Sequence, residues 1–399
     1  MQARPAQRTA WVSSVISPPA RLTDRPVAVV PFAQLKSKRL HLQCKRLHVG
    51  GQGLAATLKD VAREAQVSTA TVSRVINGHG NVTDATRARI LSIIEQLRYV
   101  PDSAARSLST GLTHTIGVLL PDLHGEFFSE IIRGIDQAAR RRGLHLLLTG
   151  VHGSAAEAAL AIRQLKGRVD GLLIMSPYAD SAFLADHSAD DTPAVLINSP
   201  VRGQSHSSFC LDNRGGARDM VRHLADVGHR RIAFIAGPQN NFDATERLAG
   251  YCEAVRALGP HVREFVLPGD FSEESGYRAA ERLLTLDERP DAVFAANDMM
   301  ALGCLRAFSD AGVAVPGEVA LAGFDDIPLA RFVSPSLTTV RVPMAELGAR
   351  ALEGVADAVG APEATPTSTE MVATELVVRA SSAARSVVNR TDQIRTQLM

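Results

Sequence analysis

Residues 57–108, TLKDVAREAQVSTATVSRVINGHGNVTDATRARILSIIEQLRYVPDSAARSL, contain three short helical patterns in succession. In the first pattern, apolar residues recur at positions 58, 61, 62 and 65, which is the spacing of a buried helix face. Thr57, Ser68 and Thr83 stand where the N-caps of the three helices are expected, and Asn77-Gly78 ends the second helix. Three short helices with a tight turn between the first two are typical of a helix-turn-helix unit.

The chain that follows alternates short apolar runs with amphipathic helical stretches. The apolar runs lie at 115–120, 144–149, 171–175, 194–198, 231–236, 292–296 and 319–323, and the helical stretches include 128–141, 214–227, 246–257, 275–285 and 298–311. This alternation predicts βαβ units and mostly parallel sheets. Because the segment is too long for one doubly wound domain, we expect two similar, Rossmann-like α/β lobes.

Composition excludes several classes of protein. The formal net charge is +1 over 399 residues, so binding to nucleic acid has to come from a local surface. No apolar run is long enough to span a bilayer, and there is no secretory signal pattern, so we expect a cytoplasmic protein without membrane partners. Four scattered cysteines and unclustered histidines predict neither disulfides nor a metal site. Because no phosphate loop, nucleophile elbow or dinucleotide fingerprint occurs, we expect no cofactor and no enzymatic activity.

The quoted stretch resembles the lactose/galactose-repressor (LacI/GalR) family. The resemblance continues through IGVLLPD, EFFSEIIRGID, DGLLIMS, LDNRGGARDMVRHLADVGHRRIAFIAGP, ERLAGY, VFAANDMMALG and LAGFDDIPLA, and so covers nearly all of the chain after residue 57. It implies a homodimeric transcription repressor that binds double-stranded, palindromic operator DNA. It also implies a periplasmic-binding-protein-like sensor whose two lobes close over a small-molecule effector, either a sugar or a related polar compound. The chain departs from common family residues at Gln66, where Gly is usual, and at QNNFD and HGE, which leaves the identity of the effector open.

The second helix of such a unit enters the major groove with its N-terminal residues toward the base edges. Those residues are Thr69 and Ala70, with Arg74 one turn further on, where it can donate two hydrogen bonds to guanine. The alternative for Arg74 is a surface salt bridge. In the family, the segment Asp102 to Ser109 forms a helix on operator DNA, and Leu108 matches the residue that wedges into the central base step. The alternative for Leu108 is a linker residue that packs on the next domain.

Small polar side chains around these helices are suited to phosphate contacts, which set register without reading sequence. For two of them, Thr57 and Ser68, simple capping is an alternative that is compatible with DNA contact. The expected backbone-contacting residues are Thr57, Ser68, Thr71, Ser73, Asn77 and Tyr99.

The resemblance places an effector site at the carboxyl ends of the strands in the sensor domain. Arg247 in ERLAGY, Asn297 at a strand end and Asp325 in the GFDD turn match ligand contacts; the alternatives for the last two are a helix cap and a turn former. Asn198 and Phe271 are expected at floor or wall positions. One of Phe127 and Phe128 is expected to line the pocket while the other faces the core. Glu126, in the variant HGE, would favour a hydroxyl-rich or cationic ligand.

These expectations divide the chain into five parts. Residues 1–55 are either a disordered extension or precede the true start, 56–101 form the helix-turn-helix domain, and 102–112 form a hinge helix and linker. Residues 113–384 form the two-lobed ligand-binding and dimerisation domain, and 385–399 form a flexible tail. A solute-binding protein of the same two-lobed fold is the alternative, but it would carry a secretion signal and would not explain residues 57–110.

Overall fold

The computed structural model describes residues 56–78, 80–100, 107, 111–151, 155–178, 192–198, 206–259, 262–361 and 368–382. Of the five expected parts, residues 1–55, the end of the chain from 383, and all of 102–110 except Ser107 lie outside these described residues. Leu108 is among them, so its expected role is not addressed by the structure.

The helix-turn-helix unit consists of α1 (Leu58–Glu64), α2 (Thr69–Ile76) and α3 (Asp84–Gln96). The three predicted N-caps are confirmed, because the side chains of Thr57, Ser68 and Thr83 each accept a hydrogen bond from the backbone N–H three residues later. The unit has its own small core, in which the most deeply buried residues are Val61, Val72 and Ile90. Burial of one face from each helix therefore holds three short helices that would be marginal alone.

The turn between α1 and α2 requires a left-handed residue. Gln66 has φ 53° there, and Val67 donates its N–H back to the carbonyl oxygen of Ala62 at 3.0 Å. A Cβ atom is disfavoured in this region of φ, whereas Gly adopts it freely. The departure from Gly therefore leaves the turn geometry in place at a local cost in free energy.

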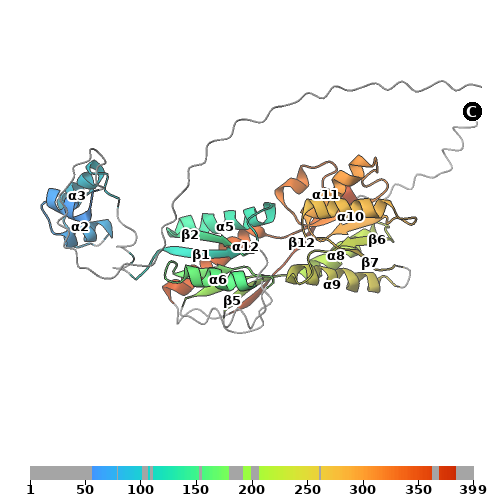
Figure 1. Cartoon of the computed structure of the whole chain (residues 1–399), viewed down its shortest axis with the longest axis horizontal. Helices are drawn as coiled ribbons and strands as arrows, with labels where there is room; N and C mark the ends of the chain where they lie inside the picture. Colours follow the sequence, from blue (N-terminus) through green and yellow to red (C-terminus); the bar gives the residue numbers. More distant parts are fainter. Residues whose placement is uncertain are drawn as a thin grey trace, which may run out of the picture. The chain divides into compact units, whose positions relative to one another are not determined.

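The remaining described chain forms two α/β lobes, as the alternation of patterns predicted (Figure 1). The first sheet has the order β11-β5-β4-β3-β1-β2 and every pairing in it is parallel. Its strands are β1 (Thr115–Leu120), β2 (His145–Gly150), β3 (Gly171–Ile174), β4 (Ala194–Ile197), β5 (Ser207–Leu211) and β11 (Thr369–Val372). Helix α6 (Ala155–Leu165) packs with one apolar cluster of this lobe, while α5 (Glu126–Arg142) and α12 (Met344–Gly360) pack together on the larger core.

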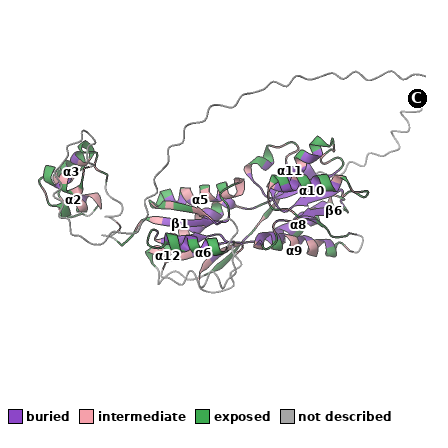
Figure 2. Cartoon of the chain, in the orientation of Figure 1, coloured by how far each residue is buried: buried purple, intermediate pink, exposed green. Residues whose placement is uncertain are grey.

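The second sheet has the order β12-β10-β9-β8-β6-β7, with one antiparallel pairing at its β12 edge. Its strands are β6 (Ile232–Ile235), β7 (Phe265–Leu267), β8 (Ala292–Ala295), β9 (Ala320–Asp325), β10 (Thr338–Arg341) and β12 (Glu375–Val377). The helices pair as α8 (Asn213–Asp226) with α9 (Phe242–Ala257) and α10 (Glu273–Leu284) with α11 (Asp298–Asp310). Buried residues lie mainly on the strands and on the helix faces turned toward them (Figure 2).

The chain passes between the lobes three times. It leaves the first sheet after β5, returns through α12 after β10, and then adds β11 to the first sheet and β12 to the second. Two of the passages meet where the Thr374 hydroxyl donates to the carbonyl oxygen of Asp212 at 3.3 Å. Two lobes joined by adjacent short segments form a hinge about which a cleft can open and close.

Candidate functional site: an exposed recognition helix and an interlobe cavity

The expected base-reading residues lie on the outer surface of α2. Thr69, Ala70 and Arg74 are exposed, while the alternating residues Val72 and Val75 are buried in the core of the unit. Among the described residues, no ion pair engages Arg74, so its guanidinium is not held by the surface salt bridge that was the alternative. The exposed face of α2 thus presents the hydrogen-bond donors of Thr69 and Arg74, while its opposite face is held in the core of the unit.

The expected phosphate-contacting side chains surround that face. Thr57 and Ser68 are exposed and cap their helices; the Thr57 hydroxyl also donates to Asp60 at 2.7 Å. Asn77 ends α2 and donates its amide to the Ser73 hydroxyl at 3.3 Å. Capping therefore occupies part of the hydrogen-bonding capacity of these groups. The remaining two members of the set, Thr71 and Tyr99, are half-buried.

A cavity of about 440 Å³ lies where segments from both lobes meet. It is bounded by the loops after β1 and β3, by the start of α5, by the N-terminal turns of α9 and α11, and by the end of β9. The carboxyl ends of parallel strands are the usual ligand position in open α/β sheets. The described lining residues are Pro121, Asp122, His124, Gly125, Phe127, Phe128, Met175, Pro177, Tyr178, Asn241, Asp243, Arg247, Asp270, Phe271, Ser272, Glu273, Asn297, Met299 and Asp325.

Six of the seven expected effector residues line this cavity, and Asn198 does not. Asn198 is fully buried behind the lining, where its amide donates to Asp243 and its carbonyl oxygen accepts the N–H of Leu211. Phe127 and Phe128 both line the cavity and both pack against the core, so the expected division between them is not observed. Their rings meet edge to face at 5.2 Å.

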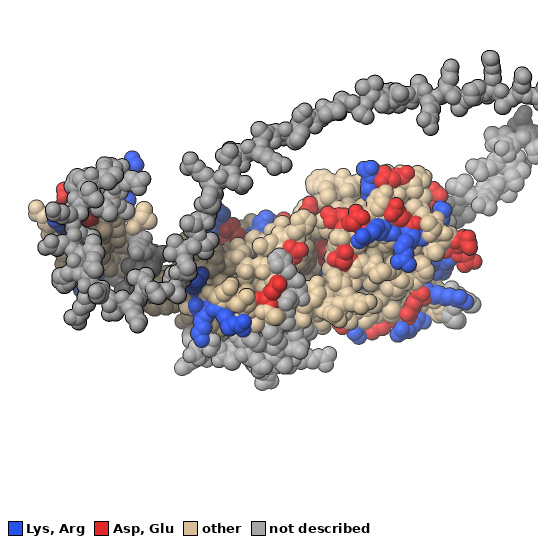
Figure 3. Space-filling view, viewed as in Figure 1, with Lys and Arg blue, Asp and Glu red and all other residues tan. Residues whose placement is uncertain are grey.

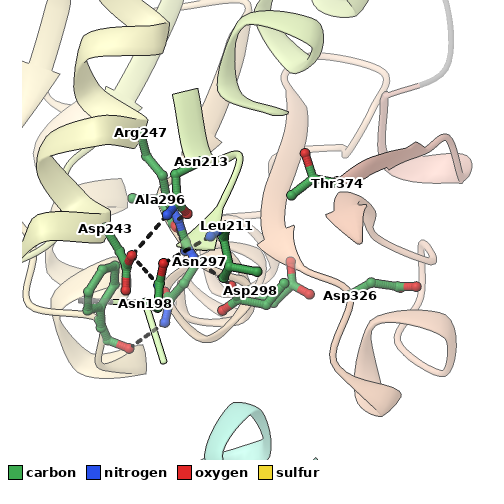
Figure 4. Close-up of polar contacts among 12 residues, drawn as sticks. Asn198, Leu211, Asn213, Asp243, Arg247, Ala296, Asn297, Asp298, Asp326 and Thr374 are labelled. Carbon is green, nitrogen blue, oxygen red and sulfur yellow. Dashed lines mark hydrogen bonds and ion pairs between the residues drawn. The ribbon is translucent and has the colours of Figure 1, made fainter. Parts of the chain in front are cut away.

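Arg247 is the most constrained side chain of the cavity. Its Nε donates to Asn213 at 2.8 Å and its Nη1 donates to the carbonyl oxygen of Ala296 at 2.6 Å. The guanidinium carbon lies 3.9 Å from the centre of the Phe324 ring, which adds a cation–π contact. These contacts fix the plane of the guanidinium and aim Nη2 at Asp325 (Figure 4 shows the contacts to Asn213 and Ala296).

Asp325 is buried at the end of β9 with φ 115°, an unfavourable conformation for a residue with a side chain. Its Oδ1 lies 3.1 Å from Arg247 Nη2, yet the atom accepts no hydrogen bond of good geometry within the described structure. Burial raises the pKa of this carboxyl to about 7, against the opposing effect of Arg247. A buried acceptor that lacks a hydrogen bond is an expected contact point for a donor on a ligand.

Asn297 combines the two roles that the sequence left open. Its carbonyl oxygen caps α11 by accepting the N–H of Met300 at 2.9 Å, and its amide donates to the carbonyl oxygen of Phe271 at 3.0 Å. The second contact supports Phe271, which has φ 71° and whose ring lines the cavity. Asn297 therefore both caps a helix and positions an aromatic wall.

Glu126 does not line the cavity, although its neighbours Gly125 and Phe127 do. Its carboxylate instead accepts the N–H of Leu329 at 3.0 Å, in the 3-10 helix η1 (Pro328–Arg331) of the other lobe. A carboxylate is stabilised at the N-terminus of a helix, where backbone donors are unsatisfied. Glu126 is therefore a contact between lobes at the rim.

The comparisons with known proteins agree with this two-part site. Residues 57–102 match the family described as bacterial regulatory proteins, lacI family, and residues 221–382 match a periplasmic binding protein-like domain. Catabolite control protein A of Priestia megaterium is 36% identical over 299 residues, which are 74% of this chain and 90% of that protein. The ribose operon repressor of Escherichia coli (strain K12) is 38% identical over 303 residues, which are 75% of this chain and 91% of that protein.

The chain belongs to the LacI family of bacterial regulatory proteins.

Solved structures extend the similarity to the whole LacI-family architecture. The lac repressor dimer bound to operator and the anti-inducer ONPF superposes with a TM-score of 0.76 at 28% identity, covering 83% of this chain and all of that one. The transcriptional regulator CelR in complex with cellobiose has a TM-score of 0.61 at 34% identity, covering 82% of this chain and 99% of that one. The match over residues 57–102 separates this chain from solute-binding proteins of the same two-lobed fold.

Within this LacI-family cavity, sequence reasoning missed Asp243. It comes from QNNFD, the segment that departs from common family residues, and it lies in the first turn of α9. Its Oδ1 accepts the amides of Asn198, from the first lobe, and Asn213 at 2.9 Å, from the second (Figure 4). Burial raises the pKa of Asp243 to about 6, and Arg247 opposes this shift. The departure of QNNFD from common family residues was the sequence signal that could have identified Asp243.

The neighbouring acids of the GFDD turn have different roles. Asp326 accepts hydrogen bonds from Arg341, at 2.7 Å, and from Arg379, which tie β9 to β10 and to the segment after β12. Asp298 accepts hydrogen bonds from the N–H of Ile327 and from the hydroxyl of Thr339. The described residues contain no cluster of metal-ligating side chains, and no described helix is long and apolar enough to cross a membrane.

Proposed function

We propose that this LacI-family protein represses transcription by binding palindromic operator DNA as a homodimer, and that a small polar effector in the interlobe cavity controls that binding. The observation that carries the proposal is the presence, in one chain, of an exposed recognition helix and a cavity with a fixed guanidinium. Relatives named as repressors, and structural neighbours named with bound cellobiose or with operator and the anti-inducer ONPF, support it. We accordingly propose that the protein acts in the cytoplasm, where operator DNA lies.

In this proposal α2 reads bases in the major groove. Arg74 donates to guanine N7 and O6, a pair worth about 1–3 kcal/mol of discrimination, and Thr69 and Ala70 contact neighbouring base edges. Side chains at the helix ends contact phosphates and set the register. On the visible face of the two lobes, acidic and basic side chains are interspersed, so the helix-turn-helix unit is the better candidate for DNA binding (Figure 3).

The effector acts through the segment between the two parts. We propose that residues 56–101 bind DNA and that residues 113–384 bind the effector and dimerise. Residues 102–112 link these two domains, and Leu108 bends the DNA. An isolated helix of about two turns is marginal in water. A coupling of about 1–3 kcal/mol from lobe closure is therefore enough to change operator occupancy many-fold.

Selection from a random DNA pool with the full-length protein tests the DNA-binding half of the proposal. We expect enrichment of a palindrome whose half-sites are matched in sequence, and loss of the guanine preference in Arg74→Ala. Ala88→Gly, on the exposed face of α3, is a control that alters the same domain away from α2. No enrichment with wild-type protein, with and without candidate sugars, would overturn the proposed function.

A further inference from the structure

The cavity lining has a strong excess of carboxylates. Among the described lining residues, Arg247 is the single Lys or Arg side chain, and His124 is the single imidazole. The lining carboxylates come from the loop after β1, the first turn of α9, the segment that leads into α10, and the end of β9. The five acidic lining residues are Asp122, Asp243, Asp270, Glu273 and Asp325.

Two of these acids share one guanidinium in the buried part of the cavity. Asp243 and Asp325 are 6% and 4% exposed, and each interacts electrostatically with Arg247. The Arg247 Nε and Nη1 atoms are already committed to Asn213 and Ala296. One buried negative charge is therefore left without a matching positive charge, a state that is costly unless a proton or a cation compensates it.

The remaining acids do not relieve this imbalance. Asp270 accepts hydrogen bonds from Ser272 and interacts electrostatically with Arg278, which does not line the cavity, and Asp122 accepts the N–H groups of Leu123 and His124. A phosphate group would bring a charge of about −1.5 to −2 into the same volume. Like charges at such distances repel strongly in a partly desolvated site.

The walls of the cavity favour a cation as well. Phe127, Phe128, Tyr178 and Phe271 contribute four aromatic rings to the lining. The face of an aromatic ring attracts an ammonium group, and aromatic side chains beside carboxylates are a recurring arrangement for amine ligands. The volume of about 440 Å³ suits a ligand of one or two rings.

We propose that the effector is an amino-substituted, ring-shaped polar compound whose protonated amino group binds beside Asp243 and Asp325, and that phosphorylated or carboxylated ligands are excluded. The inference rests on the proposed function, because it assigns a chemical class to the ligand of the same cavity. Asp243 is the specificity-determining residue, since it supplies the unmatched charge and lies in the segment that departs from the family pattern.

Isothermal titration calorimetry on the full-length protein at pH 7 tests this assignment with matched probes. The probes are glucose, glucosamine and glucose 6-phosphate, and the corresponding galactose and mannose series. Within any series that binds, we expect the amino sugar to bind at least tenfold more tightly than the parent sugar, and the phosphate not to bind. Asp243→Asn should reduce the ratio of amino-sugar to parent-sugar affinity below threefold.

Two variants keep the test independent of folding. Asp243→Ser retains an acceptor for Asn198 and Asn213 but carries no charge, and should lower the ratio as Asp243→Asn does. Asp310→Asn, at the exposed C-terminal end of α11, should leave the ratio unchanged. Tighter binding of a phosphate than of its parent sugar, an unchanged ratio in both Asp243 variants, or no amino-sugar binding in any series would overturn the inference. Operator selection by the same preparation reports separately on the proposed function.

Discussion

Nη2 of Arg247 lies 3.1 Å from Oδ1 of Asp325, and both side chains are almost completely buried. The pair joins the first half of α9 to the end of β9, two elements that meet at the floor of the cavity. Truncating one partner of such a pair leaves an uncompensated buried charge, at a cost of about 3–5 kcal/mol. Arg247 and Asp325 therefore preorganise the cavity before any ligand binds.

The charge of Asp243 predicts a pH-dependent stability. Burial raises its pKa from 3.8 to about 6, so the folded protein binds this proton more tightly than the unfolded chain does. Stability is therefore lost as the pH rises through that interval, by an amount on the order of 1–3 kcal/mol. Asp243→Asn lacks this loss. The melting temperature of the variant, relative to that of wild type, should therefore rise between pH 4 and pH 7.

Asp310→Asn is the matched control for thermal unfolding above pH 5. The pKa of Asp310 is lowered, chiefly by its hydrogen bond with Arg306, so Asp310 is already ionised in both states above pH 5. The difference between Asp310→Asn and wild type should stay constant from pH 5 to pH 8. If the melting temperature of Asp243→Asn also differs from that of wild type by the same amount at every pH, then burial of Asp243 does not make stability depend on pH.

The turn at Gln66 predicts a stabilising substitution. Gln66→Gly relieves a left-handed residue and should stabilise the helix-turn-helix unit by about 1 kcal/mol. Ala88→Gly, at an exposed position inside α3, should instead destabilise it by about 1 kcal/mol. Hydrogen exchange of the α1 and α2 amides in the full chain measures both. Faster exchange in Gln66→Gly than in wild type would count against the strained turn.

The packing of α10 against α11 predicts a sensitive glycine. A Cβ atom on Gly303 would lie 1.9 Å from the carbonyl oxygen of Glu273, so Gly303→Ala forces the two helices apart. We expect a loss of about 1–3 kcal/mol in unfolding free energy, together with weaker ligand binding, because both helices begin at the cavity. In Gly354→Ala the nearest atom, on Val195, is 3.7 Å away, so denaturant titration should show no loss. Equal effects of the two substitutions would rule out this packing constraint.

Leu108 lies outside the described residues, and its proposed role comes from the family resemblance alone. If it wedges into the central base step, Leu108→Ala should weaken operator binding roughly tenfold and reduce DNA bending, because the bend brings additional contacts. The melting temperature should not change. Gel-shift titration and a bend assay on the selected operator measure the effect, and unchanged affinity and bend angle would exclude the wedge.

Much of the fold was predictable because its signals are local. The caps at Thr57, Ser68 and Thr83 and the apolar runs of the central strands follow from neighbouring residues. The strands β5, β7, β10, β11 and β12 were not predicted, since they are short and several are rich in polar residues. β11 exists because the chain returns to pair with β5, which no local pattern encodes.

The same distinction applies to the cavity. Arg247, Asn297 and Asp325 stand in recognisable motifs, and all three line it. Asp243 was missed because the helical pattern was expected to begin at residue 246, which left Asp243 in the segment before the helix. Its second role appears only when folding brings Asn198 and Asn213 to it. The contact of Glu126 with Leu329 was not predicted either, since the two residues are distant in sequence.

Operator affinity with and without effector is the most direct test of ligand control through the cavity. It should be measured on the full chain with the ligand that calorimetry identifies, in wild type and in Met299→Trp, which fills the cavity without replacing Arg247 or Asp325. We expect the ligand to shift wild-type affinity about fivefold or more, in line with typical coupling energies. Met299→Trp should bind operator as the ligand-free wild type does and show no shift. A shift of equal size in Met299→Trp would contradict control through this cavity.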